Sequence, residues 1–128
     1  MTVFVETDFL LALAKDDDWL QERAETVLEK REIVTSPFAY LEMLIVLERH
    51  QFDYVRLFAN LLDVVPVGDE DEQQIVLKTV AYFEDGMMPF DSFHAATAEI
   101  CGLPILSSDK AYEDVDPSRI PLEPTTDE

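Results

Sequence analysis

Short apolar runs and longer amphipathic stretches alternate along most of the chain. Short runs such as residues 3–5 and 105–106 are typical of strands buried inside a parallel sheet. The pattern predicts strands at residues 3–5, 33–34, 64–67, 105–106 and 120–122, and helices at 7–15, 19–31, 36–49, 53–62, 69–85, 91–101 and 111–113. Because strands alternate with helices, we expect an α/β fold, a three-layer α/β/α sandwich with a short central parallel sheet.

The expected helix boundaries coincide with residues that favour helix ends. Thr7, Ser36 and Asp53 are suitable N-caps, and a proline follows Ser36 at the first helical position. Asp16, Asp17 and Asp18 place negative charge before the helix at 19–31. Gly86 and Gly102 end the two helices that precede them.

Length and composition indicate one domain. The chain has 128 residues, of which 48% are hydrophobic, enough for a core. We expect this domain to cover residues 1–123, followed by a flexible tail at 124–128. No stretch approaches the roughly 18 apolar residues of a membrane span, and the first residues lack the basic flank of a signal peptide. We therefore expect a cytoplasmic protein without a membrane partner. The single cysteine, Cys101, is expected to be a small buried side chain.

The charge balance is strongly acidic. Nine Lys and Arg face 28 Asp and Glu, so the net charge is −19. Such a surface repels nucleic-acid backbones and destabilises a compact state unless salt screens it. Because the acids are spread along the chain, the composition resembles that of halophilic proteins. The alternative is an acidic face that binds a basic partner protein.

Four carboxylates lie where their hydration should be lost. They end or interrupt apolar segments: Glu6, Glu42, Asp91 and Asp109. Glu42 has only apolar neighbours three and four positions away, which predicts that it faces inward. Basic residues are too few to pair with every acid, so a divalent cation is the expected partner. Parallel strands should bring the four acids to one edge of the sheet.

Four segments resemble the PIN-domain nucleases, in particular the VapC-type toxins of toxin–antitoxin pairs. Residues 3–13 contain an apolar strand, the residues Glu-Thr-Asp and an aliphatic helix, and residues 36–42 belong to a helix with a second acid. Residues 90–98 form an Ala-rich helix that begins with Asp91, and residues 103–112 contain a closing strand followed by Ser-Ser-Asp. The resemblance covers nearly the whole chain. It implies a ribonuclease that uses Mg²⁺ or Mn²⁺, an antitoxin protein as partner, and a homodimer.

The resemblance also implies roles for individual residues. The four acids would hold one or two metal ions, with Asp8 sharing this duty, and would direct phosphodiester hydrolysis. Hydroxyls that orient carboxylates or water are expected at Thr7, Ser107 and Ser108, where turn and cap chemistry is the alternative. His94 fits a helix surface better than a general base, and Lys110 either contacts a phosphate or is a surface residue.

One position departs from the family pattern. Glu6 stands where the family usually has Asp, and its extra methylene moves the carboxylate by about 1.5 Å. The competing interpretation is therefore a catalytically weakened PIN-like module for RNA processing or protein interaction. A phosphate-receiver or phosphatase domain is a third class. It would need a phospho-accepting Asp after a central strand, whereas Asp69, after residues 64–67, has the features of a helix cap.

Overall fold

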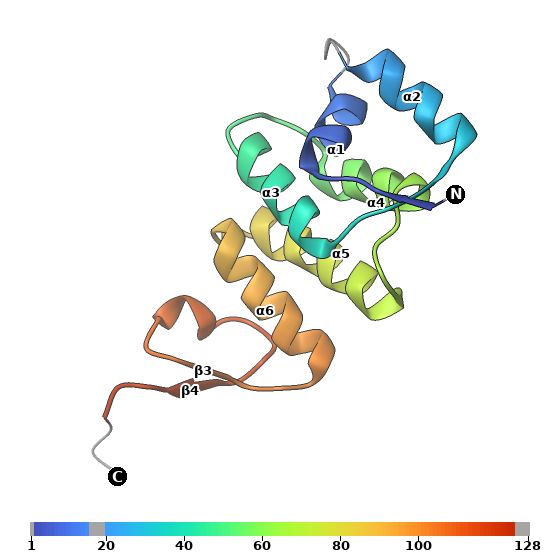
Figure 1. Ribbon diagram of the computed structural model, residues 1–128. Coiled ribbons are helices and arrows are strands. Elements are labelled where there is room, and N and C mark those ends of the chain that lie inside the picture. The colour runs from blue at the N-terminus through green and yellow to red at the C-terminus, as the bar shows by residue number, and fades with distance from the viewer. Residues whose placement is uncertain (1, 16–19, 125–128) are drawn as a thin grey trace.

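The computed structural model describes residues 2–15 and 20–124 (Figure 1). Within these ranges it contains six α-helices, one 3-10 helix and four strands of three residues each. In chain order they are β1 (Thr2–Phe4), α1 (Thr7–Ala14), α2 (Gln21–Lys30), β2 (Glu32–Val34), α3 (Pro37–Leu47), α4 (Tyr54–Val64), α5 (Glu70–Glu84), α6 (Pro89–Cys101), β3 (Ile105–Ser107), the 3-10 helix η1 (Lys110–Tyr112) and β4 (Arg119–Pro121). The α/β class expected from the sequence is confirmed.

The described strands form two separate sheets. In the N-terminal sheet, β1 pairs with β2 in parallel, with Val3 opposite Ile33. In the C-terminal sheet, β3 pairs with β4 in parallel, with Leu106 opposite Ile120. The expectation of one central sheet is therefore wrong for this structure. The physical reason is that the chain after α6 folds back along that helix and does not run beside β1 (Figure 1).

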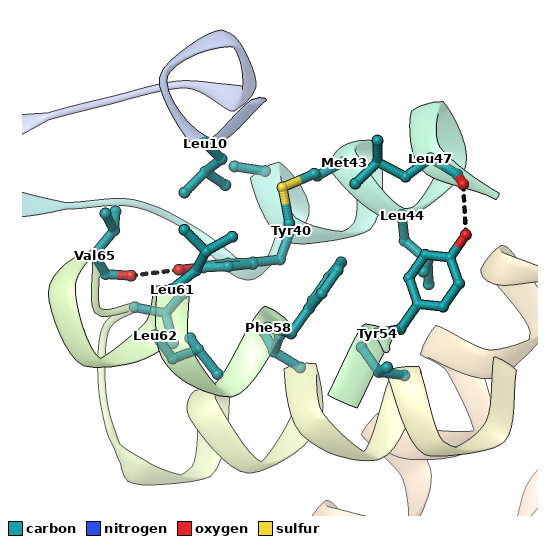
Figure 2. Close-up of a cluster of buried hydrophobic side chains, with 14 of the residues drawn as sticks. Leu10, Tyr40, Met43, Leu44, Leu47, Tyr54, Phe58, Leu61, Leu62 and Val65 are labelled. Carbon is teal, nitrogen blue, oxygen red and sulfur yellow. Dashed lines mark hydrogen bonds between the residues drawn. The ribbon is translucent and has the colours of Figure 1, made fainter. Parts of the chain in front are cut away.

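Helices make most of the hydrophobic core. The buried face of α3 contributes Tyr40, Met43 and Leu44, which pack against Leu10 of α1 and Phe58 of α4 (Figure 2). Two tyrosines satisfy buried carbonyls in this core. Tyr40 donates a hydrogen bond from its hydroxyl to the Val65 carbonyl at 2.7 Å, and Tyr54 donates to the Leu47 carbonyl. These bonds tie α3 to α4 and to the segment that follows it.

Several expected helix ends are confirmed. Asp53 caps α4 by accepting from the Arg56 amide at 3.3 Å, and Asp69 caps α5 by accepting from the Glu72 amide at 2.9 Å. Gly102 ends α6 in the left-handed region, at a φ of 69°. Glycine suits this conformation because it has no Cβ to clash with the backbone.

Other local expectations need correction. Thr7 is the first residue of α1 and Glu6 is the N-cap, so Thr7 does not cap this helix. Ser36 is the N-cap of α3 but makes no side-chain cap bond. Residues 64–67 form no strand: α4 extends to Val64, and Pro66 contributes only its carbonyl, which accepts from the Thr35 amide at 3.0 Å. The three acids at 16–18, the start of the helix expected from residue 19, and tail residues 125–128 lie outside the described residues.

The C-terminal half is held on α6. Helix α6 packs mainly on α5, and η1 lies against α6 and β3. In Figure 1 the C-terminal sheet lies on the far side of α6 from α1 and the N-terminal sheet. None of the helices in residues 2–15 and 20–124 has the length and hydropathy needed to cross a membrane.

Candidate functional site

Two of the four predicted acids, Glu6 and Glu42, lie at the junction of β1, α1 and α3. Glu6 precedes the first turn of α1, and the next residue, Thr7, reaches across to α3. The Thr7 hydroxyl donates to Glu42 Oε1 at 2.9 Å and contacts the Ala39 carbonyl at 3.4 Å. Thr7 thus fixes one oxygen of the Glu42 carboxylate, as a hydroxyl that orients an acid would. We call Glu6 and Glu42 the N-terminal acid pair.

The side of α3 that carries Glu42 is open to solvent, contrary to the expectation that it faces inward. Glu42 is exposed, and its helical neighbours Phe38 and Val46 are 57% and 47% exposed. The opposite side of α3 makes the core through residues such as Met43 and Leu44, both fully buried. The sequence pattern correctly identified apolar neighbours of Glu42, but the structure buries Ala39 and leaves Phe38 and Val46 exposed.

The other two acids, Asp91 and Asp109, lie together between α6 and the C-terminal sheet. Tyr112 of η1 donates its hydroxyl to Asp91 Oδ1 at 3.1 Å. Asp109 Oδ1 accepts from the Ala111 amide at 2.8 Å, and the Asp109 amide donates to Ser107 Oγ at 3.0 Å. The hydroxyl of Ser107 thus positions the turn that presents Asp109. We call Asp91 and Asp109 the C-terminal acid pair.

A cavity of about 600 Å³ opens beside the C-terminal acid pair. Its walls come from α6 through Asp91 and His94, and from the C-terminal segment through Ser107, Asp109 and Tyr112. His94 and Asp109 are exposed, whereas Asp91 is half-buried. The cavity is therefore an open depression that has both acids of the C-terminal acid pair in its lining, beside apolar side chains such as Leu103 and Leu106.

Tyr112 is the functional candidate that sequence reasoning missed. Its side chain is only 5% exposed, and this burial, followed by the charge of Asp91 and the hydrogen bond to it, raises the pKa of Tyr112 to about 12. Its hydroxyl therefore stays protonated at neutral pH and acts as a donor to Asp91. An aromatic residue three positions after Asp109 was visible in the sequence, but its reach back to α6 was not.

The remaining predicted residues are all exposed: Asp8 on α1, His94 on α6, and Ser108 and Lys110 around Asp109. Cys101, expected to be buried, is also exposed, because the chain turns away from the core at the end of α6. Lys110 is exposed and directly follows Asp109 in the chain.

The structure does not bring the four acids into one cluster. Among the described residues, no group of three or more Asp, Glu, His or Cys side chains is arranged to hold a metal ion. Carboxylate oxygens are the donors that Mg²⁺ and Mn²⁺ prefer, so the donor type fits such an ion. The placement of the four acids does not fit such an ion, since one acid pair lies beside the N-terminal sheet and the other beside the C-terminal sheet.

Comparison with known proteins identifies the family. No curated protein matches the chain. The family model of the PIN domain matches residues 3–117, a range that includes both acid pairs and both acid-binding hydroxyls. PIN domains are generally nucleases, which are hydrolases, and they typically use divalent metal ions. The chain therefore belongs to the PIN-domain family.

Proposed function

We propose that this PIN domain is a Mg²⁺- or Mn²⁺-dependent endoribonuclease, the toxin of a toxin–antitoxin pair. The observation that carries the proposal is the set of four acids, two of which are held by buried or half-buried hydroxyls. Thr7 fixes the direction of the Glu42 carboxylate, and Tyr112 fixes that of Asp91. Hydroxyls that hold a carboxylate in this way are common around metal ligands.

The net charge of −19 bears on how RNA would bind. Phosphates are repelled by such a surface, so binding needs cations or high salt to lower the repulsion. Lys110 is the basic side chain next to Asp109, and we assign it a phosphate contact. The same charge supports a halophilic, cytoplasmic setting, where concentrated salt screens the acids.

A second candidate is a weakened PIN module that binds RNA or protein without cleaving RNA. Two observations favour it: Glu6 replaces the usual Asp, and the two acid pairs lie apart in the described residues. Calorimetric titration with Mg²⁺ and Mn²⁺ separates the two candidates. The nuclease must bind the metal ion saturably, and Asp91→Asn must weaken that binding. A module without metal-dependent cleavage does not require such binding.

The activity itself is tested by RNA cleavage with and without divalent metal. The purified protein is incubated with a mixed-sequence RNA in 2 M KCl, first with EDTA and then with an excess of Mg²⁺ or Mn²⁺. We expect internal cleavage that stops in EDTA and returns with metal. Equal cleavage in EDTA contradicts metal dependence, and absence of cleavage in every condition contradicts the nuclease.

A further inference from the structure

A short segment, residues 107–113, presents part of the candidate site. Ser107 begins it as the last residue of β3, and Asp109 follows in the turn before η1. Tyr112 is the last residue of η1, and Glu113 comes directly after it. We call these residues the η1 segment. The positions of the Asp109 carboxylate and the Tyr112 hydroxyl therefore depend on how the η1 segment is held.

One guanidinium binds both ends of the η1 segment. Arg119, the first residue of β4, donates from Nη1 to the Ser107 carbonyl at 2.7 Å and from Nη2 to Glu113 Oε1 at 3.1 Å. Nη1 also donates to Glu123 Oε1 at 3.1 Å, and Nη2 to Glu123 Oε2 at 3.4 Å. The same side chain thus connects the beginning of the η1 segment, its end and the residues that follow β4.

These contacts differ from those of an ordinary surface ion pair, which contributes little because water solvates both of its groups. The side chain of Arg119 is only 9% exposed. Its planar fork binds a carbonyl and two carboxylates at once, a geometry that a lysine does not reproduce. The hydrogen bond from Arg119 holds the pKa of Glu123 below its usual value, so this pair is charged at neutral pH.

We propose that Arg119 is a positioning residue, which fixes both ends of the η1 segment and thereby places Asp109 and Tyr112 in the candidate site. The connection to Asp109 runs through Ser107. The Ser107 carbonyl accepts from Arg119, and the hydroxyl of the same serine accepts from the Asp109 amide at 3.0 Å. The effect on catalysis rests on the proposed function, whereas the effect on the shape of the η1 segment does not.

The alternative role for a basic side chain near a nuclease site is to bind a phosphate of the RNA. The contacts of Arg119 favour positioning over this role. Both of its terminal nitrogens already donate to protein oxygens, and little of the side chain reaches solvent. A phosphate would have to displace Glu113 or Glu123 from the guanidinium.

The partners of Arg119 determine what its removal does. Glu113 is exposed and Glu123 is partly exposed, so water can solvate both carboxylates, and the Ser107 carbonyl keeps its bond from the Leu122 amide at 3.2 Å. The stability of the whole domain should therefore change little. Both carboxylates lie within 3.4 Å of one guanidinium, and without it they repel each other. We therefore expect the η1 segment to loosen locally.

Amide hydrogen exchange tests this expectation without RNA. In Arg119→Met, which removes the fork, the hydrogen-bonded amides of the η1 segment should exchange about tenfold faster, while those of α3 and α4 should not change. Glu113→Ala removes one exposed partner and is the milder variant, with an effect in the same direction. Lys78→Met is the matched control. It breaks an ion pair of 3.1 Å to Glu99 that joins α5 to α6, and the η1 segment should keep its exchange rates.

Kinetics of RNA cleavage separate positioning from phosphate binding. A misplaced Asp109 lowers kcat and leaves KM for RNA nearly unchanged, whereas a lost phosphate contact raises KM. Arg119→Lys keeps the charge but not the fork, so we expect kcat to fall about tenfold in both Arg119→Lys and Arg119→Met. A raised KM with an unchanged kcat would overturn the proposal in favour of a phosphate contact.

Two results of the exchange measurement would also overturn it. One is an η1 segment that exchanges at the unsubstituted rate in both Arg119→Met and Glu113→Ala. The other is equal acceleration in the η1 segment, α3 and α4, which would show a general loss of stability. If the unsubstituted protein cleaves no RNA, the nuclease proposal fails, and the exchange measurement alone decides the role of Arg119.

Discussion

Removing the Tyr112 hydroxyl isolates the contact that positions Asp91. Tyr112→Phe keeps the buried ring and deletes the 3.1 Å bond to Asp91 Oδ1. A hydrogen bond to a charged group contributes roughly 1.5–3 kcal/mol, but Asp91 is half-buried beside an open cavity, so water replaces part of it. We expect the free energy of unfolding to fall by about 1 kcal/mol. Losing a group that orients a site carboxylate should lower the RNA cleavage rate by about tenfold.

Tyr40→Phe is the matched control. It also removes one hydroxyl from a buried tyrosine, and its partner, the Val65 carbonyl, lies in the core. A buried carbonyl left without a donor costs about 1–3 kcal/mol, so this variant should lose at least as much stability as Tyr112→Phe. Tyr40 contacts neither acid pair, so the Tyr40→Phe variant should cleave RNA at a rate close to that of the unsubstituted protein.

The assay compares urea unfolding with initial rates of RNA cleavage, both in 2 M KCl and well below the unfolding midpoint. For Tyr112→Phe and for Tyr40→Phe, the loss of cleavage rate is compared with the loss in the free energy of unfolding. If Tyr112→Phe cleaves RNA at the unsubstituted rate, or if both variants lose activity in proportion to stability, Tyr112 is only a structural residue.

Two further predictions concern the leading acid and the surface charge. Glu6→Asp restores the usual family residue, so cleavage should be retained or increase; a loss of more than tenfold would show that the site depends on the longer side chain. The midpoint of thermal unfolding should rise between 0.1 and 2 M KCl, since salt screens the net charge of −19. Exchanging the exposed Glu25, Glu29 and Asp63 for Gln, Gln and Asn should flatten that rise, and an unchanged slope would refute repulsion as its cause.

Local chemistry in the sequence determined much of the fold. Asp53 and Asp69 cap helices as expected because the cap bond joins residues three apart, and Gly102 ends α6 because the left-handed turn suits glycine. The strands at β1, β2 and β3 were also predictable from short apolar runs. The family, too, was visible in four segments of sequence, and the family model confirms it over residues 3–117.

Long-range placement was not predictable in the same way. Strands of three residues offer few cross-strand contacts, so their sequence specifies weakly which other strand they join. The apolar neighbours of Glu42 did not show which of them are covered: the structure buries Ala39 but leaves Phe38 and Val46 exposed. The bond from Tyr112 to Asp91 spans 21 positions and depends on the fold-back of the chain after α6.

Neutralising one acid of the C-terminal acid pair shows whether these carboxylates form the active centre. Asp91→Asn and Asp109→Asn keep the size of each side chain and remove its charge, and Asp63→Asn, on the exposed side of α4, is the matched control. Initial rates of RNA cleavage in Mg²⁺ are compared after circular dichroism shows that each variant is folded. We expect both site variants to lose RNA cleavage by at least a hundredfold, while the Asp63→Asn control keeps it. Unsubstituted rates in folded Asp91→Asn and Asp109→Asn would show that these carboxylates are not the active centre.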